Sequence, residues 1–134
     1  MSGRLEGKVA LITGAGMGQG REACRLFAEH GARIIALEID EKALADTVAL
    51  VKGEGGEIAG FVTDVSDEEQ VKAGVEGGVA QFGKLDVVYN NAGVLWRDYD
   101  SSVVDTPRDH WDKVIAINLT GVFLVLKYAV PHLK

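Results

Sequence analysis

The sequence predicts an α/β protein in which parallel strands alternate with helices. Short, continuous apolar runs, typical of strands buried on both faces, recur four times along the 134 residues. Stretches with helical spacing of apolar residues separate these runs, and a long apolar helical stretch closes the chain. Strands and helices that alternate in this way form a parallel sheet through right-handed crossovers.

Length and composition indicate a single globular domain covering residues 1–134. Hydrophobic residues make up 47% of the chain and charged residues 25%, as in ordinary soluble proteins. The formal net charge of -6 argues against a nucleic-acid partner. A single cysteine, Cys24, excludes an internal disulfide framework and fits a reducing compartment. The three histidines have no metal-ligand spacing, so we expect no metal site.

We expect a cytoplasmic protein without a membrane partner. The first eight residues contain no apolar run of the kind a signal peptide needs. The longest apolar stretch, residues 114–126, is shorter than the roughly 20 residues that cross a bilayer.

The first two strands are expected at residues 9–12 and 33–37. A glycine cluster and a helix over residues 21–30 lie between them, and Gly31 follows where a left-handed C-cap would sit. After the second strand, Asp40 is placed to cap the next helix, which Gly53 ends. That helix has apolar residues spaced by four and three on one face.

The third strand is expected at residues 58–62 and the fourth at residues 85–89. Between them, Ser66 and Glu69 have the spacing of a capping box for a helix with an apolar stripe. Three glycines interrupt that helix, and close packing against a neighbour is the simplest reason for them. Thr106 and Pro107 then supply an N-cap and a first-turn proline for the final helix.

The glycine-rich turn after the first strand predicts a phosphate site. Residues 13–20 read TGAGMGQG between a strand and a helix, where backbone N–H groups carry partial positive charge. The spacing fits neither the Walker pattern nor G-x-G-x-x-G but T-G-x-x-x-G-x-G. A glycine-rich turn without a ligand is the alternative. The residues expected to face the cofactor are Gly14, Gly16, Met17, Gly18, Gln19 and Gly20.

Further polar residues are expected at the same edge of the sheet. Glu38 follows Gly20 by eighteen residues, near the offset at which a carboxylate accepts hydrogen bonds from an adenosine ribose. A solvated strand-end carboxylate is the alternative, and Asp40 is the competing acid that we assign to capping. Asp64 ends the third strand and could accept from an exocyclic amino group or simply be solvated.

Three asparagines complete the candidate site. Asn90 and Asn91 end the fourth strand near the point where the order of the strands reverses, and turn chemistry is their alternative role. Asn118 places an amide in an apolar helix, where it needs hydrogen-bond partners. A structural role in bending the helix is the alternative for this residue.

These motifs together resemble the first half of a short-chain dehydrogenase/reductase. The match comprises the glycine motif at 13–20, the pair Asp64-Val65 after the third strand, and Asn118 within the long helix. It also includes the N-N-A-G signature, formed by Asn90, Asn91, Ala92 and Gly93. All four motifs occur in the family's order over nearly the whole chain.

The resemblance implies a Rossmann-like, doubly wound parallel sheet with strand order 3-2-1-4, the family's remaining strands being absent from this chain. It implies NAD-dependent hydride transfer between a nicotinamide cofactor and a small alcohol or carbonyl substrate. Asn118 matches a member of the family's catalytic tetrad, and Asp64-Val65 matches the pair that holds the adenine. The helix over residues 111–130 packs against its symmetry mate in the family, which implies a homo-oligomer.

The remaining tetrad residues of the family have no match. A serine on the strand after the long helix is missing, and no tyrosine is followed four residues later by lysine: Gly93 follows Tyr89, Val103 follows Tyr99, and His132 follows Tyr128. We therefore expect an N-terminal portion of a longer enzyme that is inactive alone. A complete, non-catalytic dinucleotide-binding or assembly module is the alternative.

The expected cofactor is NAD rather than NADP. Glu38 would repel a ribose 2′-phosphate, and relatives that prefer NADP usually carry arginine or lysine in the glycine turn or just after the second strand. Those positions hold Met17 and Ile39, neither of which neutralises a phosphate. Arg21 and Arg25 lie in the following helix, within possible reach of the site.

Overall fold

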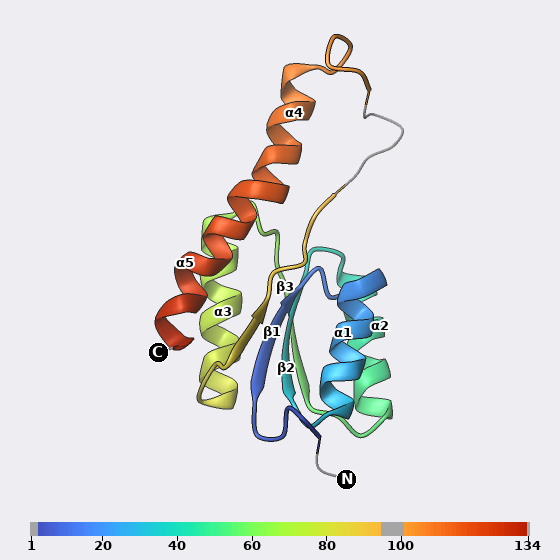
Figure 1. The fold of residues 1–134 in the computed structure, drawn as a ribbon, viewed down its shortest axis with the longest axis vertical. Helices are drawn as coiled ribbons and strands as arrows, with labels where there is room; N and C mark the ends of the chain where they lie inside the picture. The colour runs from blue at the N-terminus through green and yellow to red at the C-terminus, as the bar shows by residue number, and fades with distance from the viewer. Residues whose placement is uncertain (1–2, 95–100, 134) are drawn as a thin grey trace.

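A computed structural model describes residues 3–94 and 101–133. Figure 1 shows a parallel sheet with α1 and α2 on one face and α3 and α5 on the other. The strands are β1 Val9–Thr13, β2 Arg33–Glu38, β3 Ile58–Val62 and β4 Val87–Tyr89. The helices are α1 Gly18–Glu29, α2 Glu41–Gly53, α3 Glu68–Phe82, α4 Arg108–Ile115, the π-helical segment η1 Ala116–Thr120 and α5 Gly121–Leu133.

The sheet has the order β3-β2-β1-β4 with every pairing parallel, which confirms the predicted fold class and strand order. In the central register Leu11 lies opposite Ile35 on one side and Val88 on the other. The chain therefore adds β2 and β3 on one side of β1 and returns to its other side with β4. The carboxyl ends of β1 and β4 flank this switch point, where open α/β sheets bind ligands.

Alternate residues of the central strands divide the core into two layers. Leu11 faces a cluster that contains Val75 of α3 and Val125 of α5. Ile12 faces the opposite cluster, which contains Cys24 of α1. All five residues of β1 are fully buried, as expected for a strand covered by helices on both faces.

The N-terminal ends of α1, α3 and α4 differ from the prediction, whereas that of α2 agrees with it. Asp40 caps α2 as predicted, with Oδ1 accepting from the Ala43 N–H at 3.0 Å. The helix α1, however, begins at Gly18 rather than Arg21, so the last glycines of the motif form its first turn.

The capping box predicted at Ser66 is wrong. Asp67 caps α3 and accepts from the Gln70 N–H at 3.2 Å, whereas the Ser66 hydroxyl donates to Asp64 Oδ1 at 2.7 Å. The ionised carboxylate of Asp67 is the stronger acceptor at the positive end of a helix. In α4 the N-cap is Pro107, one residue after the predicted Thr106.

The glycines of α3 allow this helix to lie close to the sheet. An added Cβ at Gly77 would lie 2.8 Å from Phe61 Cε1, and one at Gly74 would lie 2.9 Å from Leu37 Cδ2. At Gly78 it would overlap the side chain of Ile35. Close packing therefore accounts for the three interruptions.

The C-terminal helix is longer than the apolar stretch of residues 114–126 that was judged too short to cross a membrane. The segments α4, η1 and α5 form one helix over Arg108–Leu133, 26 residues with a mean hydropathy of 1.8 in its most apolar window. By length and composition alone this helix could cross a membrane, although 22% of that window is buried. Leu124, Val125 and Ala129 form its buried part and contribute to the core beside α3.

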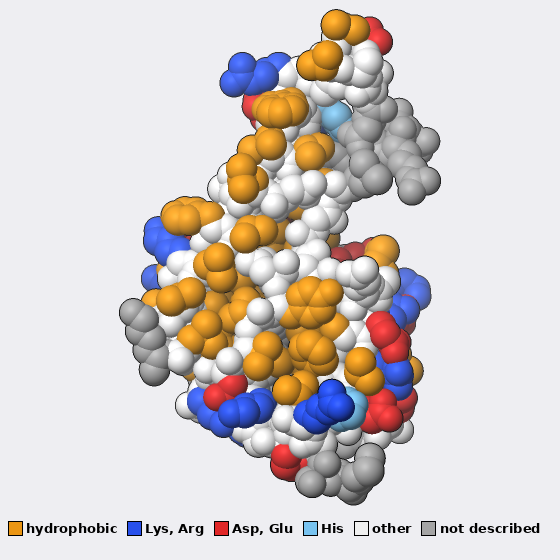
Figure 2. All heavy atoms as spheres, viewed as in Figure 1, with side chains coloured by type: hydrophobic (Ala, Val, Ile, Leu, Met, Phe, Trp, Pro, Cys, Tyr) orange, Lys and Arg blue, Asp and Glu red, His pale blue; other side chains and the backbone are white. Residues whose placement is uncertain are grey.

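The same helix carries much of the exposed apolar surface. Figure 2 shows hydrophobic side chains gathered along it and continuing onto the body of the molecule. Phe123 is 60% exposed and Leu119 is 64% exposed. At the core side, Glu68 at the start of α3 accepts from Lys127 Nζ at 2.6 Å and from the Tyr128 hydroxyl at 2.5 Å, which ties α3 to α5.

Candidate functional site

A cavity of about 550 Å³ opens at the carboxyl ends of the strands, beside the switch point. Nine of the predicted cofactor residues line it: Gly14, Met17, Glu38, Ile39, Asp64, Val65, Asn91, Ala92 and Gly93. Five lining residues were not predicted, namely Leu37, Asp40, Thr63, Val94 and Ile117. Leu37 and Thr63 flank predicted residues at strand ends, a position that could have singled them out from sequence.

The glycine-rich turn lies against its neighbours too closely for side chains. Gly14 has φ +63°, and an added Cβ there would lie 3.0 Å from Ala92 Cα. One at Gly16 would lie 2.7 Å from Glu38 Cδ, and one at Gly20 would overlap the carbonyl oxygen of Gly14. The turn therefore packs closely against its neighbours because it has no side chains at these positions, and such a turn lets a pyrophosphate approach the backbone. Gly14 and Met17 line the cavity, whereas Gly16, Gly18 and Gly20 are not among its lining residues.

The start of α1 is also suited to an anion. Met17 at its N-cap makes no side-chain hydrogen bond to the helix, and the first turn contains no acidic residue. By contrast, α2 and α3 are capped by Asp40 and Asp67 and have acidic residues in their first turns. The N–H groups at the start of α1 are thus left for a ligand, with the positive end of the helix dipole behind them.

Glu38 joins the glycine turn to the start of α2. Its Oε1 accepts from the Gly16 N–H at 2.8 Å, and its Oε2 accepts from the Asp40 N–H at 3.0 Å. The residue is only 8% exposed, so the alternative of a solvated strand-end carboxylate does not describe it. A carboxylate has about four acceptor positions, so two backbone bonds leave capacity for ribose hydroxyls.

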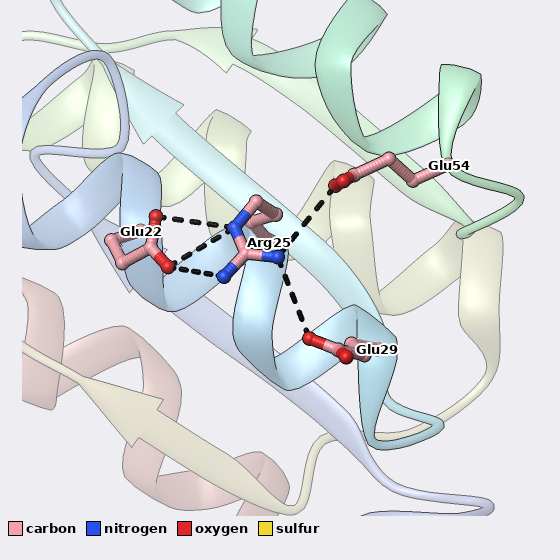
Figure 3. Close-up of polar contacts among 4 residues, drawn as sticks. All are labelled: Glu22, Arg25, Glu29 and Glu54. Carbon is pink, nitrogen blue, oxygen red and sulfur yellow. Dashed lines mark hydrogen bonds and ion pairs between the residues drawn. The ribbon is translucent and has the colours of Figure 1, made fainter.

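Neither arginine of α1 lines the cavity. Arg21 donates through Nε to Thr47 Oγ1 at 3.0 Å and through Nη2 to the Ala43 carbonyl at 3.3 Å. Arg25 is held in a cluster of three glutamates on α1 and at the end of α2, shown in Figure 3. The partners in this cluster are Glu22, Glu29 and Glu54.

Thr13 organises the N-N-A-G segment, a role that was not predicted from the sequence. Its fully buried hydroxyl accepts from the Asn91 and Ala92 N–H groups, both at 2.9 Å, and donates to Asn90 Oδ1 at 3.4 Å. Asn90 Nδ2 donates in turn to the Val122 carbonyl at 3.1 Å, so this side chain connects β4 to α5 and does not line the cavity. A polar residue closing an apolar strand was the available sequence signal.

Asp64 keeps acceptor capacity at the cavity. Its Oδ1 accepts from the N–H and the hydroxyl of Ser66, at 2.9 and 2.7 Å. Its Oδ2 has no hydrogen-bond donor within residues 3–94 and 101–133. The carboxylate is therefore held in place by one oxygen while the other can accept from a ligand.

Asn118 and Gln19 lie outside the cavity lining. Asn118, in the π-helical segment η1, accepts from the Val94 N–H at 2.7 Å and donates to the Val94 carbonyl at 2.9 Å. The amide thereby fixes a residue that does line the cavity. Single π-helical turns occur frequently at functional sites. Gln19 accepts from the Tyr89 hydroxyl at 3.3 Å.

Known proteins resemble this chain in both sequence and fold. The short chain dehydrogenase family model matches residues 8–134. The 3-oxoacyl-acyl-carrier-protein reductase FabG of Thermotoga maritima is 42% identical over 97% of this chain and 52% of its own length. Short-chain dehydrogenase reductase 3b of Arabidopsis thaliana is 40% identical over 96% of this chain and 49% of its own.

Solved structures also resemble this chain. Carveol dehydrogenase from Mycobacterium avium in complex with NAD superposes with a TM-score of 0.92 and 38% identity, over 98% of this chain and 51% of that one. An NAD⁺-bound xylitol dehydrogenase gives 0.90 and 38%, over 96% and 49%. The chain thus spans about half the length of these relatives. With its family model matched along nearly all of its length, it belongs to the short chain dehydrogenase family.

Proposed function

We propose that this chain forms the NAD-binding portion of an oxidoreductase that transfers hydride between a nicotinamide cofactor and a small alcohol or carbonyl compound. One observation carries the proposal. The glycine cradle, the uncapped start of α1 and the buried carboxylate of Glu38 meet at one cavity beside the switch point. The NAD-bound relatives support the choice of cofactor.

Each part of the cavity would hold a different part of the dinucleotide. The N–H groups of the turn and of α1 would bind the pyrophosphate, and Glu38 would accept from the adenosine ribose hydroxyls. Asp64 and Val65 would hold the adenine, with the Asn91–Gly93 segment as the opposite wall. When bound, the nicotinamide supplies the hydride acceptor or donor.

Preference for NAD over NADP follows from the charges near the ribose site. Glu38 would place a like charge beside a 2′-phosphate in a largely buried environment. Arg21 and Arg25, the two cations of α1, are engaged with α2 and with the glutamate cluster rather than with the cavity. Among the lining residues within 3–94 and 101–133, none is a lysine or an arginine.

Asn118 is proposed to serve the catalytic site by positioning. Its two hydrogen bonds to Val94 hold the segment after the N-N-A-G motif against the π-helical turn. The resemblance supports this proposal, because Asn118 matches a member of the family's catalytic tetrad.

A non-catalytic dinucleotide-binding module remains the second candidate. Its support is that no tyrosine in the 134 residues is followed four positions later by lysine, so proton transfer lacks the family's usual group. Turnover assays separate the two candidates. We expect the full-length protein to form NADH from one or more secondary alcohols, and the 134-residue chain to form none.

Three results would count against this proposal. Failure of the full-length protein to bind NAD would contradict the cofactor site itself. Binding of NAD without turnover across alcohol and carbonyl panels would favour the module. Detectable NADH formation by the 134-residue chain would contradict the expectation that this chain is inactive alone.

A further inference from the structure

We propose that Thr47, a residue of α2 outside the cavity, is a positioning residue for the pyrophosphate-binding turn. The inference rests on the proposed NAD site and adds a residue from a helix that the glycine motif does not include. Thr47 lies 32 residues after Ala15 in the chain, yet its hydroxyl reaches the middle of the turn.

The Thr47 hydroxyl is fully buried between α2 and the turn. It donates to the Ala15 carbonyl at 2.8 Å and accepts from Arg21 Nε at 3.0 Å. A threonine within a helix ordinarily donates to the carbonyl four residues earlier. That carbonyl, of Ala43, lies farther away at 3.2 Å, so the bond to the turn is the shorter one.

The guanidinium of Arg21 strengthens this arrangement. Its charged N–H group donates to the Thr47 oxygen, which directs the hydroxyl proton toward the Ala15 carbonyl. Because Arg21 lies in the first turns of α1, one hydroxyl connects the turn, the start of α1 and α2.

The bond to Ala15 completes a clamp on the turn. Ala15 is fully buried, and its N–H donates to the Leu37 carbonyl of β2 at 3.3 Å. On either side of it, Gly14 adopts φ +63° and the Gly16 N–H is held by Glu38. The turn is thus held from β2 through one backbone group and from α2 through the other.

Removing the hydroxyl leaves the Ala15 carbonyl and the Arg21 Nε–H without their partner. A buried group in that state tends to move toward water or another partner, and this movement would rotate the neighbouring peptide groups that face the phosphates. Positioning of the phosphates would weaken most. The Ala15 carbonyl and the Gly16 N–H belong to one peptide group, so Glu38, which accepts from Gly16, would be disturbed less directly, and Asp64, which is bonded to Ser66 and not to the turn, would keep its contacts.

The experiment compares ADP with adenosine, because only ADP has the phosphates that the turn binds. Dissociation constants of both probes, and of NAD, are measured by calorimetric or NMR titration on the full-length protein. For Thr47→Val, which keeps the shape and removes the hydroxyl, we expect ADP and NAD to bind about tenfold more weakly. Adenosine binding is expected to weaken clearly less than ADP binding, by no more than about twofold, because adenosine has no phosphate and meets the turn only through Glu38. Thr47→Ser, which retains the hydroxyl, is expected to restore ADP affinity to within about threefold of the unsubstituted protein.

Val51→Ala is the matched control, since Val51 is buried on the same helix and forms no side-chain bond to the turn. It should lower thermal stability and leave ADP affinity unchanged. Unchanged ADP binding in Thr47→Val, equal losses for ADP and adenosine, or the same ADP loss in Val51→Ala would each overturn the proposal. If the unsubstituted protein binds neither ADP nor NAD, the proposed function fails as well, whereas the other outcomes overturn the role of Thr47 alone.

Discussion

At the residue scale, the carboxylate of Glu38 would determine the charge at the proposed ribose site. Replacing it by the neutral Glu38→Gln removes the repulsion of a 2′-phosphate, so the ratio of NADP to NAD affinity should rise. The unsubstituted protein should favour NAD by roughly 100-fold, and the substitution should remove much of that preference. Titration of both cofactors against the full-length protein measures the ratio.

Asp40→Asn is the control for this prediction. It removes the same unit of charge two residues away and keeps a side chain that can cap α2. Its effect on the ratio should be clearly smaller. Equal affinities of the unsubstituted protein for NAD and NADP, or no change of the ratio in Glu38→Gln, would refute the assignment of Glu38.

The burial of Cys24 supports a second prediction at the residue scale. Its side chain is fully buried in the core, and burial raises the pKa of the thiol to about 12. The thiolate, which is the reactive form, is therefore scarce in the native protein at pH 8. A thiol reagent should label the native protein far more slowly than the urea-unfolded chain. Labelling of both forms at the same rate would contradict the burial.

The same raised pKa has a consequence for stability at alkaline pH. An unfolded cysteine ionises at roughly 8.5, so above that pH the unfolded state binds fewer protons than the folded state. The contribution of Cys24 to the free energy of unfolding is thus complete below about pH 8.5 and decreases as the pH rises toward 12. Cys24→Ala should reduce this alkaline loss in denaturant titrations.

At the scale of elements, the close approach of α3 to the sheet depends on its glycines. Gly78→Ala would gain about 1 kcal/mol of helix propensity but would force Cβ into Ile35 of β2. The cost of overpacking is typically 1–3 kcal/mol, so we expect a net destabilisation of about 1 kcal/mol. Urea unfolding followed by circular dichroism measures the change.

Gly53→Ala provides the matched substitution in another helix. No atom lies within 4 Å of a Cβ added at Gly53, the last residue of α2. This variant should gain up to about 0.5 kcal/mol, because only propensity changes. Stabilisation by both substitutions would show that α3 can move away from the sheet without cost.

At the scale of the whole molecule, the exposed apolar face of the C-terminal helix predicts self-association. Within the helix over residues 111–130, Phe123 and Leu126 are 60% and 40% exposed, and Val114 is partly buried. A second copy of the chain could cover this face, as the resemblance implies. Phe123→Glu should therefore weaken a dimer or higher oligomer, which light scattering would report as a fall in mean mass.

Val104→Glu controls for the added charge. Val104 is 84% exposed and lies outside the helices, so its substitution should leave the mass unchanged. A monomeric unsubstituted protein at high micromolar concentration would contradict the predicted assembly. So would an oligomer that Phe123→Glu and Val104→Glu affect equally.

The fold was largely predictable because its signals are local. Runs of apolar residues such as 9–12 give buried strands, and their alternation with helical spacing gives a parallel sheet. The order of the strands came from the family resemblance rather than from spacing. The helix starts were less well predicted, since Ser66 and Asp67 are both good capping residues and only the helix geometry selects Asp67.

The sequence by itself determined where the glycine turn and the strand-end acid of the proposed cofactor site lie, because glycine spacing and the offset to Glu38 can be measured along the chain. Tertiary structure alone decided which groups hold that turn. Thr13 reaches the N-N-A-G segment across 78 residues, and Thr47 reaches Ala15 across 32. The physical reason is that a buried hydroxyl takes its partner from whatever backbone group folding places beside it, and no pattern along the chain encodes that distance.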